Sequence, residues 1–166
     1  RAGVSAYPMA PPTKYSRCAA ARPAVSSRIM TKDELVAAVK GIVAQARAGD
    51  QDGANRAYQA LFTKPGFTKL APQDQRTALR LLVLAKRSGA ASADLVEAHR
   101  AALGPLTELV SAVNDPEDYE MLGICHLLLG NEQGASNIFR AGLQLERERS
   151  PQSDLCGRLM TRLSSI

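Results

Sequence analysis

The sequence lacks several features that would place it in a well-defined class. Its 166 residues contain no tryptophan, and only 4% of them are aromatic. The three cysteines, Cys18, Cys125 and Cys156, are odd in number and widely spaced, which argues against a disulfide framework and against a C-x-x-C metal site. We expect Cys125 and Cys156 to be reduced and packed as small apolar residues. No apolar run approaches the roughly 18 residues of a membrane-spanning helix.

Motifs that carry catalysis are also missing. His99 and His126 do not have H-E-x-x-H spacing, and the sequence contains no P-loop, no G-x-S-x-G and no G-x-G-x-x-G motif. An acidic cluster at 115–120 lies where a helix is predicted to begin, and negative charge at that end stabilises a helix through its dipole. We therefore expect no enzymatic activity, no metal and no cofactor.

Acidic residues are absent from residues 1–29, although this segment holds five basic side chains. Residues 30–166 contain 16 basic and 16 acidic side chains, so the first 29 residues carry the whole formal net charge of +5. A neutral folded part does not predict a nucleic-acid-binding face. For the folded part we expect neither a nucleic-acid partner nor a membrane span.

Residues 1–29 show no helical or strand period, and we interpret them as an extended or disordered basic tail before a folded domain at 30–166. Three origins of the tail are open: the remains of an organelle-targeting segment, an arm that lies on a partner, or sequence upstream of a start at Met30. Thr31 and Glu34 have the spacing of a capping box, which predicts a helix start. The expected location is the cytoplasm or, after removal of a targeting segment, an organelle interior.

From Thr31 onward, apolar residues recur every three or four positions, which indicates amphipathic helices and an all-α fold class. Gly104-Pro105 is expected to interrupt the fourth helix, and Ser150-Pro151 is expected to cap the seventh. The predicted helices lie at about 31–48, 51–63, 72–88, 92–113, 114–129, 132–149 and 152–163.

An internal repeat organises these helices. Residues 49–54 match residues 130–135 in their glycines and alanine, and an aromatic residue follows each alanine by four positions, at Tyr58 and Phe139. A weaker third copy begins at Gly89. The leading glycine of each copy can close a helix in the left-handed conformation, and the alanine allows two helices to approach closely. One helix pair cannot bury its apolar face alone, but stacked pairs can.

The best copy is similar to a known family. Segment 118–145 resembles a tetratricopeptide repeat in Tyr119, Leu122, Gly123, Gly130, Ala135, Phe139 and Gly142. Segment 35–61 agrees in its second half but has Ile42 where the family has a small residue, and segment 78–103 is the most divergent. The resemblance implies about three helix pairs with a C-terminal capping helix, and a concave face that binds a peptide segment or a helix of another protein.

If the resemblance holds, the inward faces of the first helices of each pair supply the binding residues. The candidates are Arg47, Arg76, Val83, Lys86, Arg87, Glu117, Glu120, Ile124 and Leu127. We expect an apolar floor with basic side chains on one part and acidic ones on another, suited to an extended segment with an acidic end. The alternative is that the apolar members are ordinary core and that the charges form a solvated surface.

The predicted function is that of a protein-binding adaptor, scaffold or assembly subunit. Two alternatives are open: a secretion-type chaperone for an export substrate, and an accessory subunit of a large organelle complex that uses residues 1–29 as an arm. The C-terminal helix at 152–163 is expected to cap the last repeat, with exchange between two copies as the alternative. The oligomeric state stays open.

Overall fold

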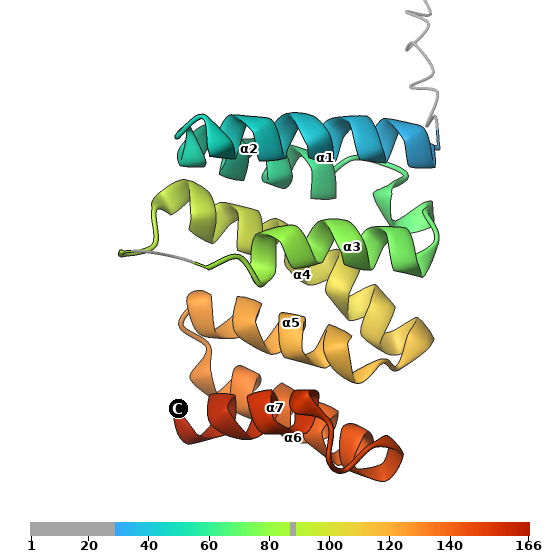
Figure 1. Cartoon of the computed structure of the whole chain (residues 1–166), viewed down its shortest axis with the longest axis vertical. Coiled ribbons are helices and arrows are strands. Elements are labelled where there is room, and N and C mark those ends of the chain that lie inside the picture. Colours follow the sequence, from blue (N-terminus) through green and yellow to red (C-terminus); the bar gives the residue numbers. More distant parts are fainter. Residues whose placement is uncertain (1–28, 87–88) are drawn as a thin grey trace, which may run out of the picture.

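The computed structural model describes residues 29–86 and 89–166, and all regular secondary structure within them is helical (Figure 1). The described helices are α1 (Lys32–Arg47), α2 (Gln51–Phe62), the short 3-10 helix η1 (Phe67–Lys69), α3 (Pro72–Val83), α4 (Ala93–Val113), α5 (Pro116–Leu128), α6 (Glu132–Arg149) and α7 (Asp154–Ser164). No strand occurs in these residues, so the predicted all-α class is confirmed. None of the described helices has the length and apolar character needed to cross a membrane. The expected tail at 1–29 lies almost wholly outside the described residues.

The helices stack in layers. α1 lies against α2, α3 against α4 and α5 against α6, while α7 packs on α6 at the end of the stack (Figure 1). Contacts between α2 and α4 and between α4 and α5 join successive layers. In the view of Figure 1, α1, α3, α5 and α7 lie toward the reader and run in the same direction, with their C-terminal ends on the left. The even-numbered helices lie behind them.

The first and third pairs turn in the same way, which explains the repeated sequence. Gly49 has φ +94° and Gly130 has φ +76°, so both adopt the predicted left-handed conformation. In each turn the next residue donates its N–H back to the helix, from Asp50 to the Gln45 carbonyl and from Asn131 to the His126 carbonyl. This is the Schellman arrangement, which satisfies carbonyls at the helix end.

The residue after each of these glycines caps the following helix. The side chain of Asp50 accepts a hydrogen bond from Gly53 N, and the side chain of Asn131 accepts one from Gly134 N, each at 2.9 Å. A Cβ added to Gly134 would lie 2.5 Å from Asn131 Nδ2, so the capping side chain occupies that space. The second glycine of the repeated motif therefore makes room for the cap.

Packing within a pair depends on a large residue opposite a small one. A Cβ added to Gly123 would lie 2.3 Å from the Phe139 ring, and a Cβ on Gly142 would lie 2.6 Å from Tyr119 Cβ. These two glycines let α5 and α6 approach closely. In the first pair, Ala38 and Leu61 stand at the positions equivalent to Tyr119 and Gly142. The larger of the two side chains is therefore on α2 in the first pair and on α5 in the third pair.

Three predicted helix boundaries are wrong. The helix predicted to end at residue 88 ends at Val83, because the side chains that follow are exposed and no packing extends the helix. Pro105 does not interrupt α4, because Ala102, Pro105 and Leu109 lie on one continuous buried stripe that offsets the missing N–H. Ser153, rather than Ser150-Pro151, caps α7 through a bond from Cys156 N.

Two other local predictions are confirmed. Thr31 and Glu34 form both bonds of the capping box, with Thr31 N donating to Glu34 Oε2 at 2.9 Å and Glu34 N donating to Thr31 Oγ1 at 3.2 Å. Cys125 and Cys156 are reduced and buried in the apolar core. The capping box at Thr31 therefore starts α1 where the sequence placed a helix start.

Candidate partner-binding site

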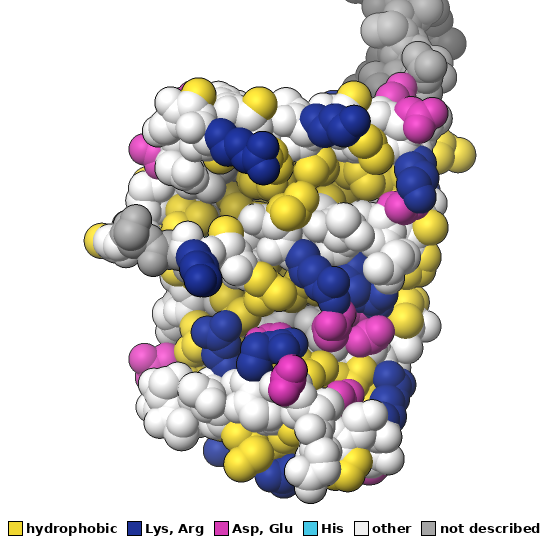
Figure 2. Space-filling view, in the orientation of Figure 1, with side chains coloured by type: hydrophobic (Ala, Val, Ile, Leu, Met, Phe, Trp, Pro, Cys, Tyr) yellow, Lys and Arg dark blue, Asp and Glu magenta, His cyan; other side chains and the backbone are white. Residues whose placement is uncertain are grey.

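The candidate site lies on the surface formed by α1, α3, α5 and α7, which we call the odd-helix face. Figure 2 shows this face, with hydrophobic side chains visible between the layers of helices. On α1, residues Val36, Val39 and Val43 recur at three- and four-residue spacing, and Val36 is 40% exposed. Leu81 on α3 and Leu84 just after it are similarly exposed, at 43% and 39%. The face therefore presents apolar side chains to solvent on two successive layers.

A groove of about 510 Å³ lies on this face between the C-terminal ends of α3 and α5, and we call it the α3–α5 groove. Its lining consists of Val83, Leu84, Ala85, Gly89, Ala91, Ile124, Leu127, Leu128 and Arg162. Val83 and Ile124 are buried and form part of its floor, whereas Leu84 is exposed. Three predicted site residues, Val83, Ile124 and Leu127, are thus brought together in one apolar concavity, and Arg162 is the one charged side chain among the described residues that line it.

Arg76 does not present its charge to this groove. Its Nε and Nη2 atoms each donate a 2.7 Å hydrogen bond to one carboxylate oxygen of Asp118, and Asp115 lies 3.5 Å away. Hydrogen bonds to the carboxylate of Asp118, which is completely buried, raise the pKa of Arg76 above its ordinary value. The prediction that Arg76 meets a partner carboxylate is corrected, because its bidentate pair lies inside the α3–α5 contact.

The predicted acidic residues are also paired within the chain. Glu117 accepts a hydrogen bond from Arg80. Glu120 is 1% exposed and accepts bonds of 3.0 to 3.1 Å from Arg158 Nε and Nη2 on α7. These bonds raise the pKa of Arg158 above its ordinary value. The acidic residues expected to line a groove therefore tie α5 to α3 and α7, which corrects the prediction of an acidic patch open to a partner.

Basic side chains on the same face are available to solvent. Lys40 and Arg47 extend the Val36–Val39–Val43 stripe of α1 and are exposed. Lys86 is exposed beyond the end of α3, directly after the groove residue Ala85. No carboxylate among the described residues forms an ion pair with any of these three. The predicted site residue Arg87 lies outside the described residues.

The chain matches no protein-family model, no curated protein and no solved structure. The case for a function therefore depends on the geometry and chemistry of this face. In residues 29–86 and 89–166, no group of His, Cys, Asp and Glu side chains could hold a metal ion.

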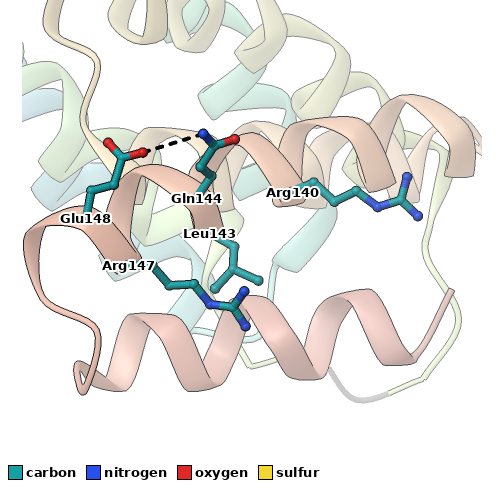
Figure 3. Close-up of a pocket in the computed structure, with 5 residues that line it drawn as sticks. All are labelled: Arg140, Leu143, Gln144, Arg147 and Glu148. Carbon is teal, nitrogen blue, oxygen red and sulfur yellow. Dashed lines mark hydrogen bonds between the residues drawn. The ribbon is translucent and has the colours of Figure 1, made fainter.

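A second concavity, of about 460 Å³, lies along α6 beside α7 (Figure 3). Its lining side chains all come from α6, and Figure 3 shows Arg147 extending toward α7 and Gln144 hydrogen-bonded to Glu148. Arg140, Gln144, Arg147 and Glu148 are all exposed, and only Leu143 is buried. Water competes for every polar contact here, so this concavity is a weaker candidate than the apolar α3–α5 groove.

The sequence prediction missed Leu84 and Arg162, which both line the groove. Leu84 stands one residue past the end of α3, where helical periodicity no longer defines a face. Arg162 belongs to α7, which was expected only to cap the stack. A signal for Arg162 was present in its four-residue spacing from Arg158, which places two basic side chains on the α7 surface that faces Glu120.

Proposed function

We propose that this protein is a helical-repeat module that binds a segment of another protein on its odd-helix face, as an adaptor, scaffold or assembly subunit. The observation that carries the proposal is the open α3–α5 groove, where Leu84, Leu127 and Leu128 surround a floor formed by Val83 and Ile124. Apolar concavities with a few polar side chains at the edge are typical of binding sites. A partner that covers these leucines gains stability by removing apolar surface from water.

A tetratricopeptide-like arrangement supports the same proposal. The paired helices, the left-handed glycines at the turns and the glycine–aromatic contacts of α5 and α6 are the features that the resemblance implies. In such an arrangement the first helices of each pair line the binding face, and here these are α1, α3 and α5. α7 has the place of a capping helix, since it buries Leu155, Cys156 and Leu159 against the last pair.

We assign binding rather than catalysis to this face because its buried charged groups are engaged in structural pairs. Asp118 binds Arg76 and Glu120 binds Arg158, so each carboxylate has its hydrogen-bonding capacity directed at a guanidinium. A carboxylate held in this way stabilises the fold and is a poor general base.

The experiment is affinity purification from the source organism with three forms of the protein, followed by mass spectrometry. The first is the wild type, the second is Leu84→Glu in the groove, and the third is Val113→Glu at the end of α4. Leu84 and Val113 are both 39% exposed, so the two substitutions place the same charge at equally accessible sites. We expect partners recovered by the wild type and by V113E to be lost with L84E.

Circular dichroism of all three forms checks that helix content is equal. Recovery of the same partners with L84E and with the wild type would place binding elsewhere on the molecule. Absence of any partner specific to the wild type would contradict the proposal as a whole.

A further inference from the structure

Three exposed basic side chains of the odd-helix face lie at the same end of their helices. Arg47 ends α1, Lys86 follows α3, and Arg162 lies in the last turn of α7. Because these helices run in the same direction, their C-terminal ends form one edge of the face (Figure 1). In Figure 2, Lys and Arg side chains appear on the left part of this face on several layers. We call Arg47, Lys86 and Arg162 the basic edge.

Apart from Glu120, which lies 3.9 Å from Arg162, the acidic side chains of α5 do not pair with this edge. Asp115 and Asp118 lie with Arg76 at the opposite, N-terminal end of α5, and Glu117 binds Arg80. Asp118 is completely buried, so its charge is directed inward. The charge of the face is thus divided, with compensated pairs at one end of the helices and exposed cations at the other.

Arg162 connects the basic edge to the groove. It lines the α3–α5 groove, its side chain is 41% exposed, and its Nε lies 3.9 Å from Glu120 Oε1, which is too far for a hydrogen bond. Glu120 already accepts three hydrogen bonds from Arg158. Arg162 therefore keeps donors free for a second carboxylate, and that carboxylate would sit beside the apolar groove.

We propose that the partner is an acidic peptide segment that runs along the stack of helices, with an apolar side chain in the α3–α5 groove and carboxylates at the basic edge. This inference rests on the proposed binding function and adds the chemistry and direction of the partner. Charge complementarity selects the occupant, because Arg47 and Lys86 have no carboxylate partner among the described residues and the groove residue Arg162 makes only a 3.9 Å ion pair with Glu120. The basic first 29 residues of this chain hold no acid, so charge disfavours them as the occupant.

The test begins with a library of random 12-residue peptides displayed on phage and selected on the full chain at low salt. We expect enrichment of peptides that combine Asp or Glu with Leu, Ile or Phe. One enriched peptide is then synthesised twice, once as selected and once with every Asp and Glu replaced by Asn and Gln. Binding of both forms is measured by fluorescence anisotropy at several salt concentrations.

Two triple variants complete the design. R47Q/K86Q/R162Q removes the basic edge. K64Q/R100Q/R140Q removes three exposed basic residues from the turn after α2, from α4 and from α6 as a control with the same number of charges removed. We expect the first variant to weaken binding of the acidic peptide about tenfold or more and the control to change it less than about twofold. Added salt should weaken binding to the wild type and have little effect on the first variant, because exposed ion pairs are screened.

The outcomes separate this inference from the proposed function. The inference would be overturned by enrichment of apolar peptides without an acidic preference, or by acidic peptides that bind both triple variants equally. In either case the proposed function survives if L84E abolishes binding of the enriched peptides. Enrichment of basic peptides would likewise overturn it. Failure to enrich any peptide, or enrichment of peptides that bind L84E as well as wild type, would overturn both.

Discussion

At the scale of single residues, the most consequential feature is the pair of buried carboxylates on α5. Asp118 is completely buried and Glu120 is 1% exposed, and each is held by a guanidinium from a different helix. A buried pair of this kind contributes little net stability compared with apolar packing, but removing one partner leaves an uncompensated charge. These side chains therefore make the contacts of α5 with α3 and α7 specific and sensitive to substitution.

The first prediction concerns Asp118. Replacing it with asparagine leaves the Arg76 charge buried without its bidentate partner, and we expect the free energy of unfolding to fall by about 3 kcal/mol. Urea denaturation followed by circular dichroism measures this change as a lower midpoint at unchanged slope. Arg56→Gln is the control, because Arg56 is 59% exposed in its pair with Asp94 and should contribute less than about 1 kcal/mol. Equal effects of D118N and R56Q would refute the buried-pair account.

The second prediction compares two helical glycines. Gly123→Ala places a methyl group against the Phe139 ring, and we expect it to destabilise the fold by about 1–3 kcal/mol through overpacking. Gly41→Ala meets nothing within 4 Å and should stabilise α1 by about 0.5–1 kcal/mol, because alanine loses less backbone entropy in a helix. Thermal unfolding shows whether each substitution raises or lowers the melting temperature, and we expect a lower value for G123A and a higher one for G41A. A stabilising G123A would show that α5 and α6 are not in close contact at this point.

The roles of these residues were only partly predictable from the sequence. The resemblance gave Gly123 and Phe139 as a small and an aromatic position of segment 118–145, and the structure places these two residues in contact within one helix pair. The partners of Arg76 and Glu120 were not predicted, because they lie 42 and 38 residues away along the chain. Periodicity assigns a charged residue to a helix face, but it does not say which other helix covers that face.

At the scale of helices, two caps with the same geometry differ in their chemistry. Asp50 caps α2 and Asn131 caps α6, each through the backbone N–H three residues later. Hydrogen bonds from Gln45 and from the Gly53 backbone hold the pKa of Asp50 below the ordinary value of an aspartate. The cap of α2 therefore responds to acid, whereas the amide cap of α6 does not titrate.

The third prediction follows from the sign of that shift. Because the folded pKa is lower than that of the unfolded chain, about 3.9, the contribution of Asp50 to stability is fully present above that value and is lost as pH falls through the folded pKa. We expect the Gly53 amide signal in NMR to shift over this acidic range and to stay constant in Asp50→Asn. The Gly134 amide is the internal reference. Titration of Asp50 above about 3.9 would contradict the assigned hydrogen bonds.

The fourth prediction concerns the attachment of α7. Arg158→Gln leaves the buried carboxylate of Glu120 without its three hydrogen bonds, and we expect α7 to open more easily by about 1–3 kcal/mol. Hydrogen exchange of α7 amides should accelerate, while that of α1 and α2 stays unchanged. Arg162→Gln should have a smaller effect, because Arg162 lies 3.9 Å from Glu120. Unaltered α7 exchange in R158Q would show that apolar contacts alone hold this helix.

Helix positions were largely predictable, and the errors have physical causes. The capping box at Thr31 and the glycines at 49 and 130 mark local chemistry that does not depend on the rest of the fold. Pro105 was misjudged because its local cost of about 3 kcal/mol is offset by burial on α4, which no local pattern reveals. The end of α3 was misjudged for the converse reason, since helix-favouring residues after Val83 find nothing to pack against.

At the scale of the whole molecule, the repeat explains why the stack presents two unlike faces. Helices α2, α4 and α6 lie on one side, and α1, α3, α5 and α7 form the other, with the α3–α5 groove between their C-terminal ends. The sequence predicted that α1, α3 and α5 share the face and that Val83, Ile124 and Leu127 lie on it, but it assigned α7 only the role of a cap. It did not predict that Asp118, Glu117 and Glu120 would pair with arginines of the same chain, which leaves exposed positive charge at the basic edge.

The most direct test of the central claim is an NMR map of the bound face. The ¹⁵N-labelled protein is titrated with a partner segment obtained by the purification or selection described above, and amide shift changes are recorded for the described helices. We predict that the largest changes fall on Leu84, Leu127, Leu128 and Arg162, with α2, α4 and α6 little affected. Changes concentrated on the even-numbered helices, with the α3–α5 groove unaffected, would contradict the account.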